Sequence, residues 1–234
     1  MNFKNQIYDA LKYTLKDWKT IILLGIILCT LPVIIETETN YLLIAALLFF
    51  VSVILTLFEE GYRYEIIKET IKGNNNPPSI GNIKLLLKEG VYETIIIVIY
   101  WGIIFLLNKM AEYMNQLNIF NWPLWVVLSV ISLIVYFLFF GATVNKALHN
   151  DRFISALNFI EIGKFYLKIG VKRTVVLIIV GIISINFIEI SVMGMGIHNF
   201  AKIIDLIINL TISPIMLLFM TRLTALIGRE ITYD

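Results

Sequence analysis

Polar side chains interrupt the last two long apolar stretches of the chain, where a charge is costly in hydrocarbon and is often functional. Glu189 lies in the first of these stretches, with Asn186 three residues before it and therefore on the same helical face. The second stretch carries polar residues at intervals of four. In an antiparallel hairpin the two sets face each other, which predicts an outward-facing polar pocket formed by Asn186, Glu189, Asp205, Asn209 and Ser213.

Two chemical roles are open to this predicted pocket. It can bind a cation, a proton or a polar headgroup, with Pro214 freeing a backbone carbonyl as a further ligand. Alternatively, Glu189 pairs with Lys202 and the other side chains form interhelical hydrogen bonds that fasten the hairpin. The second role needs no ligand.

The rest of the sequence offers little for catalysis or metal binding. Cys29 is the only cysteine, which excludes an internal disulfide and a cysteine cluster. His149 and Asp151 are neighbours without a third metal ligand at a usable spacing. The sequence contains no nucleotide-binding glycine motif, nucleophile elbow or HExxH motif. We therefore expect a protein that is not an enzyme and that uses no cofactor and no metal.

The elements that must position these residues follow from the composition. The chain is 59% hydrophobic and 15% charged, with a mean hydropathy of +0.83, whereas a soluble domain is roughly 25% charged. Its apolar stretches are close to the ~20 residues that a helix needs to cross ~30 Å of hydrocarbon. The sequence predicts an all-α, multi-pass protein of the cell membrane, with one transmembrane domain over residues 1–234. Six spans are predicted at about residues 20–35, 41–58, 91–108, 123–143, 174–195 and 203–221.

Lysine and arginine are distributed unevenly between these predicted spans. Alternate segments hold 17 and 2 of them. Because cytoplasmic segments carry the excess of positive charge, both termini and the two long loops are predicted to be cytoplasmic. Amphipathic helices are predicted in these segments, either lying in the membrane interface or packing against the ends of the spans. They cover Phe3 to Leu15, residues 59–72 and residues 152–168, and the Asn- and Pro-rich residues 73–82 predict a turn.

Three segments repeat an approach of lysine and threonine to an apolar run. LKEGVYETIII begins at Leu87, LKIGVKRTVVL begins at Leu167, and a weaker copy without the glycine, LKDWKTIILL, begins at Leu15. Chance similarity is one explanation. The other is three tandem units, each an interfacial helix followed by a transmembrane hairpin, over about residues 1–80, 81–158 and 159–234.

In the repeat hypothesis each segment is a corner between an interfacial helix and a span. Gly90 and Gly170 permit the turn, and a threonine caps the new helix at Thr20, Thr94 and Thr174. Basic side chains near the corners then reach anionic headgroups while their stems cover apolar surface. The predicted headgroup contacts are Lys16, Lys19, Lys88, Lys168, Lys172 and Arg173.

Three stretches carry a resemblance to a known family: ALKYTLKDWKTIILLGIIL at 10–28, GYRYEIIKETIKGNNNPP at 61–78 and RFISALNFIEIGKFYLKIG at 152–170. The sequence resembles an archaeal membrane family known as domain of unknown function 4013, which is distantly similar to the membrane portions of some glycerophosphodiesterases. The resemblance implies an archaeal cell membrane and supplies no reaction and no site residue.

Two functions remain open at this point. The first is a non-enzymatic membrane protein that organises lipid or a partner protein, with anionic lipids of the cytoplasmic face as its expected partners and no nucleic acid. The alternative is a small transporter or channel that uses the pocket between the last two spans. Association with a partner protein or a second copy of the chain is also open.

Overall fold

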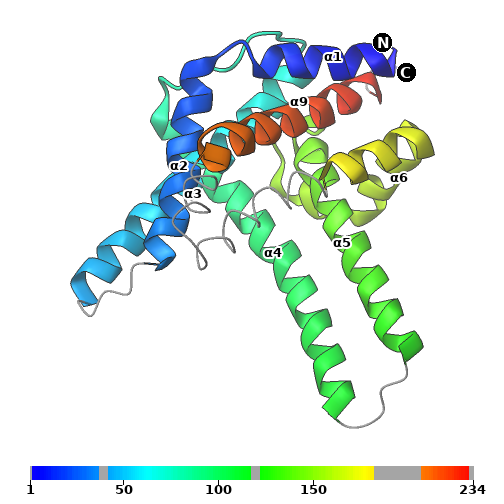
Figure 1. Cartoon of the computed structure of the whole chain (residues 1–234). Helices are drawn as coiled ribbons and strands as arrows, with labels where there is room; N and C mark the ends of the chain where they lie inside the picture. The colour runs from blue at the N-terminus through cyan, green and yellow to red at the C-terminus, as the bar shows by residue number, and fades with distance from the viewer. Residues whose placement is uncertain (1, 37–41, 117–121, 182–206, 232–234) are drawn as a thin grey trace.

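A computed structural model describes residues 2–36, 42–116, 122–181 and 207–231, which contain helices and no strand (Figure 1). The helices run in the order α1 (Phe3–Thr14), α2 (Trp18–Glu36), α3 (Leu42–Ile71), α4 (Ile83–Gln116), α5 (Trp122–Leu148), a 3₁₀ helix (Phe153–Leu157), α6 (Phe159–Ile169), a π-helical turn (Ile208–Ile212) and α9 (Ser213–Ile231). Residues 171–181 are also helical. The prediction of an all-helical chain is confirmed over these residues.

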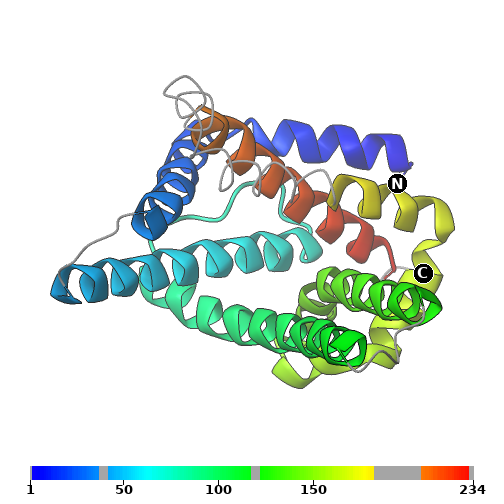
Figure 2. The ribbon, with the colours of Figure 1, turned by 60° about the horizontal axis from the view of Figure 1, so that its bottom comes forward.

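Two helical hairpins project from a layer of helices at one end of the molecule. In Figure 1, α4 and α5 extend downward side by side, while α2 and α3 form a second projection. The helices α1, α6 and α9 lie across the other end, and the turned view in Figure 2 agrees. The start of α1 and the end of α9 meet there, because the Gln6 side-chain amide donates a hydrogen bond of 2.8 Å to Glu230.

The core of this layer is built around α9. Leu223 and Ile227 are fully buried, and they belong to a cluster with Ala10 of α1, Val144 of α5 and Phe165 of α6. Burial of this kind stabilises the fold by roughly 25 cal/mol for each Å² of apolar surface removed from solvent. The chain's last described helix therefore holds the other elements together.

Three described helices are long and apolar enough to cross a membrane: Ile83–Met114, Val126–Leu148 and Ile208–Glu230. Trp18–Cys29 is a shorter apolar helix. A membrane location follows from these lengths and compositions. The count of six spans and the cytoplasmic termini stay predictions, and most of the predicted fifth span, 174–195, lies outside the described residues.

Two predictions about the segment between the second and third spans are wrong. Residues 59–72 do not form a separate interfacial helix, because α3 continues without a break through Ile71. Residues 73–82 do form the predicted turn. Asn82 then accepts a hydrogen bond of 3.2 Å from the Leu85 amide and caps α4, which runs straight through Gly90. The second copy of the repeat therefore has no corner at Gly90.

Gly90 instead lies where α4 crosses α3. A Cβ on Gly90 would lie 1.8 Å from the Leu57 carbonyl oxygen, and a Cβ on Gly61 would lie 1.8 Å from the Leu86 carbonyl oxygen. At each glycine, a backbone carbonyl of the other helix thus packs directly against the Cα atom. Small residues at such a crossing let two helix backbones approach closely.

We expect Gly90→Ala to lower the free energy of unfolding by about 2–3 kcal/mol, because the new methyl group forces the two backbones apart. Gly102→Ala is the matched control on the same helix, since a Cβ there meets nothing within 4 Å. It should be neutral or stabilising by up to about 1 kcal/mol. Unfolding in detergent micelles measures both, and equal effects would contradict the crossing.

The other two corners differ in their chemistry. Gly170 ends α6 with φ +82°, a left-handed conformation that suits glycine, so the predicted turn there is confirmed. At α2, Asp17 is the cap, because its carboxylate accepts a hydrogen bond of 3.3 Å from the Thr20 amide. Thr94 lies inside α4 and caps nothing.

Candidate functional site

The helix α6 presents two different faces. Asn158 caps its N-terminus, because the Asn158 side chain accepts a hydrogen bond of 3.2 Å from the Glu161 amide. Ile162, Phe165 and Ile169 follow at helical spacing and are buried against the rest of the protein. The buried face anchors α6 and fixes the direction of the opposite face.

The opposite face of α6 combines apolar residues with lysines. Leu167 is 83% exposed, and Val171, just after the helix, is 81% exposed. Lys164, Lys168 and Lys172 are exposed among them. Large apolar side chains next to lysines are typical of helices in a membrane interface, where the apolar groups enter the bilayer and the ammonium groups meet the headgroups.

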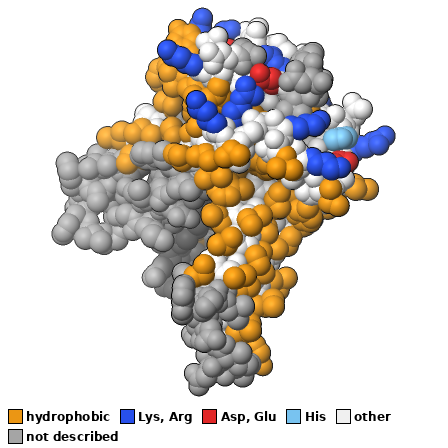
Figure 3. All heavy atoms as spheres, turned by 90° about the vertical axis from the view of Figure 1, so that its right-hand side faces the viewer, with side chains coloured by type: hydrophobic (Ala, Val, Ile, Leu, Met, Phe, Trp, Pro, Cys, Tyr) orange, Lys and Arg blue, Asp and Glu red, His pale blue; other side chains and the backbone are white. Residues whose placement is uncertain are grey.

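The described surface of the molecule has an apolar part and a basic part. In Figure 3, hydrophobic side chains cover the lower part of the described surface, while lysine and arginine side chains gather above them. Exposed apolar residues of α4 and α5 include Val98, Phe105, Val130 and Ile134. A basic band bordering an apolar zone is the arrangement expected at the edge of a bilayer with anionic lipids.

The predicted headgroup contacts are mostly on the surface. Five of the six are exposed: Lys16, Lys19, Lys88, Lys168 and Lys172. Arg173 is partly buried, and its guanidinium lies 2.8 Å from the Glu230 carboxylate. Lys16 donates a hydrogen bond to the Asn76 side chain. Contact of these residues with lipid stays a prediction.

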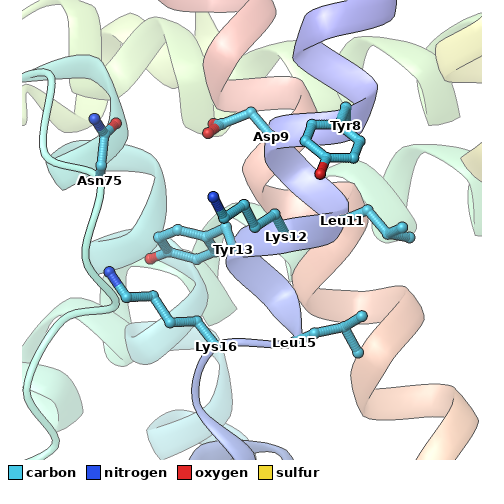
Figure 4. Close-up of a pocket in the computed structure, with 8 residues that line it drawn as sticks. All are labelled: Tyr8, Asp9, Leu11, Lys12, Tyr13, Leu15, Lys16 and Asn75. Atoms are coloured by element: carbon cyan, nitrogen blue, oxygen red, sulfur yellow. The ribbon is translucent and has the colours of Figure 1, made fainter.

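A first groove runs along α1 beside the turn of residues 73–82. It encloses about 650 Å³ and includes Lys12, Lys16 and Asn75. In Figure 4, both lysines point toward the segment that carries Asn75, while Leu11 and Leu15 lie on the other side of α1. The predicted stripe of α1 is therefore divided, because Leu11 and Leu15 are exposed whereas Phe3 and Ile7 pack against the core.

A second groove of about 330 Å³ lies between the end of α5 and α6. His149 comes from α5's C-terminal end, and Glu161, Lys164 and Lys168 come from α6. The His149 Nε2 and Glu161 Oε2 atoms are 3.7 Å apart. The His149 side chain thus lies beside the Glu161 carboxylate of α6. The sequence alone placed only Asp151 near His149.

Sequence reasoning missed a buried ion pair between α4 and α5. Lys146 is 1% exposed, and its ammonium lies 2.7 Å from Glu93 and 3.2 Å from Glu89. Glu93 is only 2% exposed, so its carboxylate lies inside the protein. The ammonium also lies 3.7 Å from the centroid of the Tyr64 ring on α3, a cation–π contact. The signal in the sequence was the spacing of the two glutamates, which puts both on one face of a helix.

Tyr64 extends this network to the loop after α5. Its hydroxyl donates a hydrogen bond to Asp151, whose carboxylate also pairs with Lys68. Burial raises the pKa of Asp151, but the hydrogen bonds from Lys68 and Tyr64 outweigh it, so this pKa lies below its ordinary value. A lowered folded pKa contributes stability above the unfolded value of about 4, and this contribution is lost as the pH falls through the folded value.

A second buried charge, Arg222 of α9, was also missed. It is completely buried, and its guanidinium donates hydrogen bonds to Asp9, to Thr70, to the Asn74 carbonyl and to the Asn75 side chain at 2.7–3.1 Å. It also stacks 4.3 Å from the ring centroid of Tyr13. One arginine thus joins α1, α3, α9 and the turn of residues 73–82. The turn is therefore a structural element as well as a solvated surface.

The predicted polar pocket is described only in part. Asn186, Glu189 and Asp205 lie outside the described residues. Asn209 and Ser213 are buried, and the Ser213 hydroxyl lies 3.5 Å from the Asn209 side-chain oxygen, so these two are brought together within one helix. This local contact is compatible with the fastening role.

Pro214 explains the π-helical turn that carries Asn209. Proline has no amide hydrogen, so it cannot donate to the Leu210 carbonyl, and the Ser213 amide donates to the Ile208 carbonyl five residues back. The Leu210 carbonyl faces α2, where a Cβ on Gly25 would lie 2.3 Å from its oxygen. The Leu210 carbonyl thus lacks the Pro214 amide as a donor and packs closely against α2.

The comparisons with known proteins give a family and no activity. Neither the curated proteins nor the solved structures contain a match to the chain. The model of one family, described as protein of unknown function (DUF4013), matches residues 44–198. The archaeal origin and the likeness to glycerophosphodiesterase membrane portions remain expectations from the resemblance. The matched range covers most of the chain, so the protein belongs to the DUF4013 family.

Proposed function

We propose that this protein is a non-catalytic membrane protein that binds anionic lipid headgroups through α6 and organises lipid around its helices. The observation that supports the proposal is the exposed surface of α6 and of the residues just after it, where Leu167 and Val171 stand beside Lys164, Lys168 and Lys172. Each lysine near an anionic surface contributes about 1 kcal/mol of attraction. The cell membrane with its anionic cytoplasmic face is the proposed location.

The rival proposal, transport through the last hairpin, has less support. It depends on Asn186, Glu189 and Asp205, for which the described residues give no geometry. The two described members of that pocket, Asn209 and Ser213, already contact each other. The α6 surface is therefore the better basis for a function.

The proposal predicts that the purified chain retains phosphatidylglycerol in preference to phosphatidylcholine, as measured by lipid titration and native mass spectrometry. A triple variant, Lys164→Gln, Lys168→Gln and Lys172→Gln, should lower this preference at least about ten-fold, since about 1 kcal/mol per lysine corresponds to roughly five-fold. Zwitterionic lipid should bind as before.

The matched control removes the same charge elsewhere. Lys4→Gln, Lys72→Gln and Lys84→Gln change three other exposed lysines that are not on α6. This control should keep the preference. An equal loss in both triple variants would mean that net charge acts rather than α6, and a wild type without any preference would end the proposal.

A further inference from the structure

His149 and Glu161 both line the groove between α5 and α6. The His149 Nδ1 atom lies 2.8 Å from the Asn145 carbonyl oxygen. Because a carbonyl only accepts, Nδ1 carries the hydrogen. In the neutral ring the Nε2 lone pair is then directed at the Glu161 carboxylate, 3.7 Å away. In this form the two side chains offer two separate acceptors to a ligand in the groove.

Asn145 contacts both His149 and Glu161 from the buried side of the groove. It is buried, and its amide nitrogen donates to the Ser155 carbonyl at 2.7 Å and to Glu161 at 3.4 Å. Its backbone carbonyl orients the His149 ring. The side chains of His149 and Glu161 are 45% and 42% exposed, so both are fixed from the buried side and open toward the groove.

Two cations line the same groove. Lys164 and Lys168 are one helical turn apart on α6, and both are exposed. Their two positive charges exceed the single negative charge of Glu161. The groove therefore combines a site for an anion with a pair of acceptors for hydroxyl donors, within a volume of about 330 Å³ that suits a small ligand group.

We propose that this groove binds the phosphate ester of a vicinal diol. The phosphate contacts Lys164 and Lys168, one hydroxyl donates to His149 Nε2, and the other donates to the Glu161 carboxylate. A lipid with a polyol headgroup and a free polyol phosphate share this chemistry. The lipid form rests on the proposed function, whereas the arrangement of donors and acceptors does not.

A comparison of phosphatidylglycerol with phosphatidylpropanol distinguishes the contribution of the hydroxyls to binding from that of the charge. The two headgroups have the same charge and length, and only the first carries the diol. Lipid titration of the full wild-type chain, read by native mass spectrometry, should give about ten-fold tighter binding of phosphatidylglycerol, since hydrogen bonds to charged acceptors are the stronger class. Equal binding of the two lipids would overturn the inference. If both still bind better than phosphatidylcholine, the proposed function survives that result.

Glu161→Gln should reduce the difference between the two lipids without weakening phosphatidylpropanol, because it replaces a charged acceptor by a weaker neutral one and removes a negative charge beside the phosphate. A variant that merely disturbed the fold would weaken both lipids. Lys164→Gln with Lys168→Gln should weaken both lipids equally. Glu69→Gln, an acidic residue of α3 outside the groove, is the matched control and should change neither.

Free glycerol 3-phosphate identifies the source of the ligand. Displacement of phosphatidylglycerol at millimolar concentration, weakened by Glu161→Gln, supports a free polyol phosphate. Absence of displacement, with the lipid difference intact, supports the lipid. If neither anionic lipid is preferred to phosphatidylcholine and glycerol 3-phosphate does not bind, both the inference and the proposed function are wrong.

Discussion

Replacing Lys146 by methionine is expected to lower the free energy of unfolding by about 3–5 kcal/mol, because the change leaves two glutamates buried without their cation. Methionine keeps most of the length and volume of lysine, so the effect reports charge rather than a cavity. Glu93 and Glu89 lie 2.7 Å and 3.2 Å from the ammonium that would be lost. Unfolding in mixed detergent micelles measures the change.

A second substitution tests whether the loss is electrostatic. Glu93→Gln should destabilise the wild type, where it removes one partner of Lys146, and should stabilise the Lys146→Met variant, where it removes an unpaired charge. This reversal of sign does not occur if Lys146 acts only through packing. Lys109→Met is the matched control, because Lys109 and Glu112 form an exposed pair worth less than about 1 kcal/mol.

Arg222→Ala is expected to cost a similar amount, about 3–5 kcal/mol, and to release two segments that are distant in sequence. The guanidinium is the shared donor to Asp9 of α1 and to the Asn74 and Asn75 groups of the turn. Hydrogen exchange should therefore increase in both segments at once, over Phe3–Thr14 and residues 73–76. An increase confined to α9 would contradict the linking role.

Two further variants define what Arg222 supplies. Arg222→Lys keeps the charge but lacks the planar set of donors, so it should recover only part of the stability. Arg152→Ala changes an arginine that is exposed before the 3₁₀ helix. This control should stay within about 0.5 kcal/mol of the wild type.

Local patterns in the sequence predicted local structure well. Within the described residues the apolar runs became helices, residues 73–82 became a turn, and Gly170 ended α6 with a positive φ. Asn209 and Ser213 are four residues apart, and their contact within one helix is of the same local kind. Each of these outcomes depends on residues that are close together in the chain.

The misinterpreted glycine shows where local patterns stop being sufficient. Gly90 and Gly170 follow the same Leu-Lys-x-Gly-Val pattern, yet one lies inside a helix and the other ends one. The difference arises because α3 crosses α4 at Gly90. Gly61 of α3 lies at this crossing and packs directly against the α4 backbone. A repeated sequence motif did not reveal this partner, because the contact is between helices.

The buried charges were missed for the same reason. Lys146 is 53 residues from Glu93, and the hydrogen bond from Arg222 to Thr70 spans 152 residues. From sequence alone, these charged groups are expected to be solvated, since charges near the ends of apolar runs usually are. The packing of α4 against α5 buries Lys146 and Glu93, and the packing of α9 against α1 and α3 buries Arg222.

The contact between Asp9 and Arg222 also orders events during synthesis. The two residues are separated by 213 positions, so α1 leaves the ribosome long before its partner exists. Chains fold largely as they emerge, at about 5–20 residues per second, and α1 must wait for roughly 10–40 seconds with its buried face unpaired. Docking of α1 is therefore a late event in biogenesis, and an accessible α1 marks a chain in which α9 has not yet packed against it.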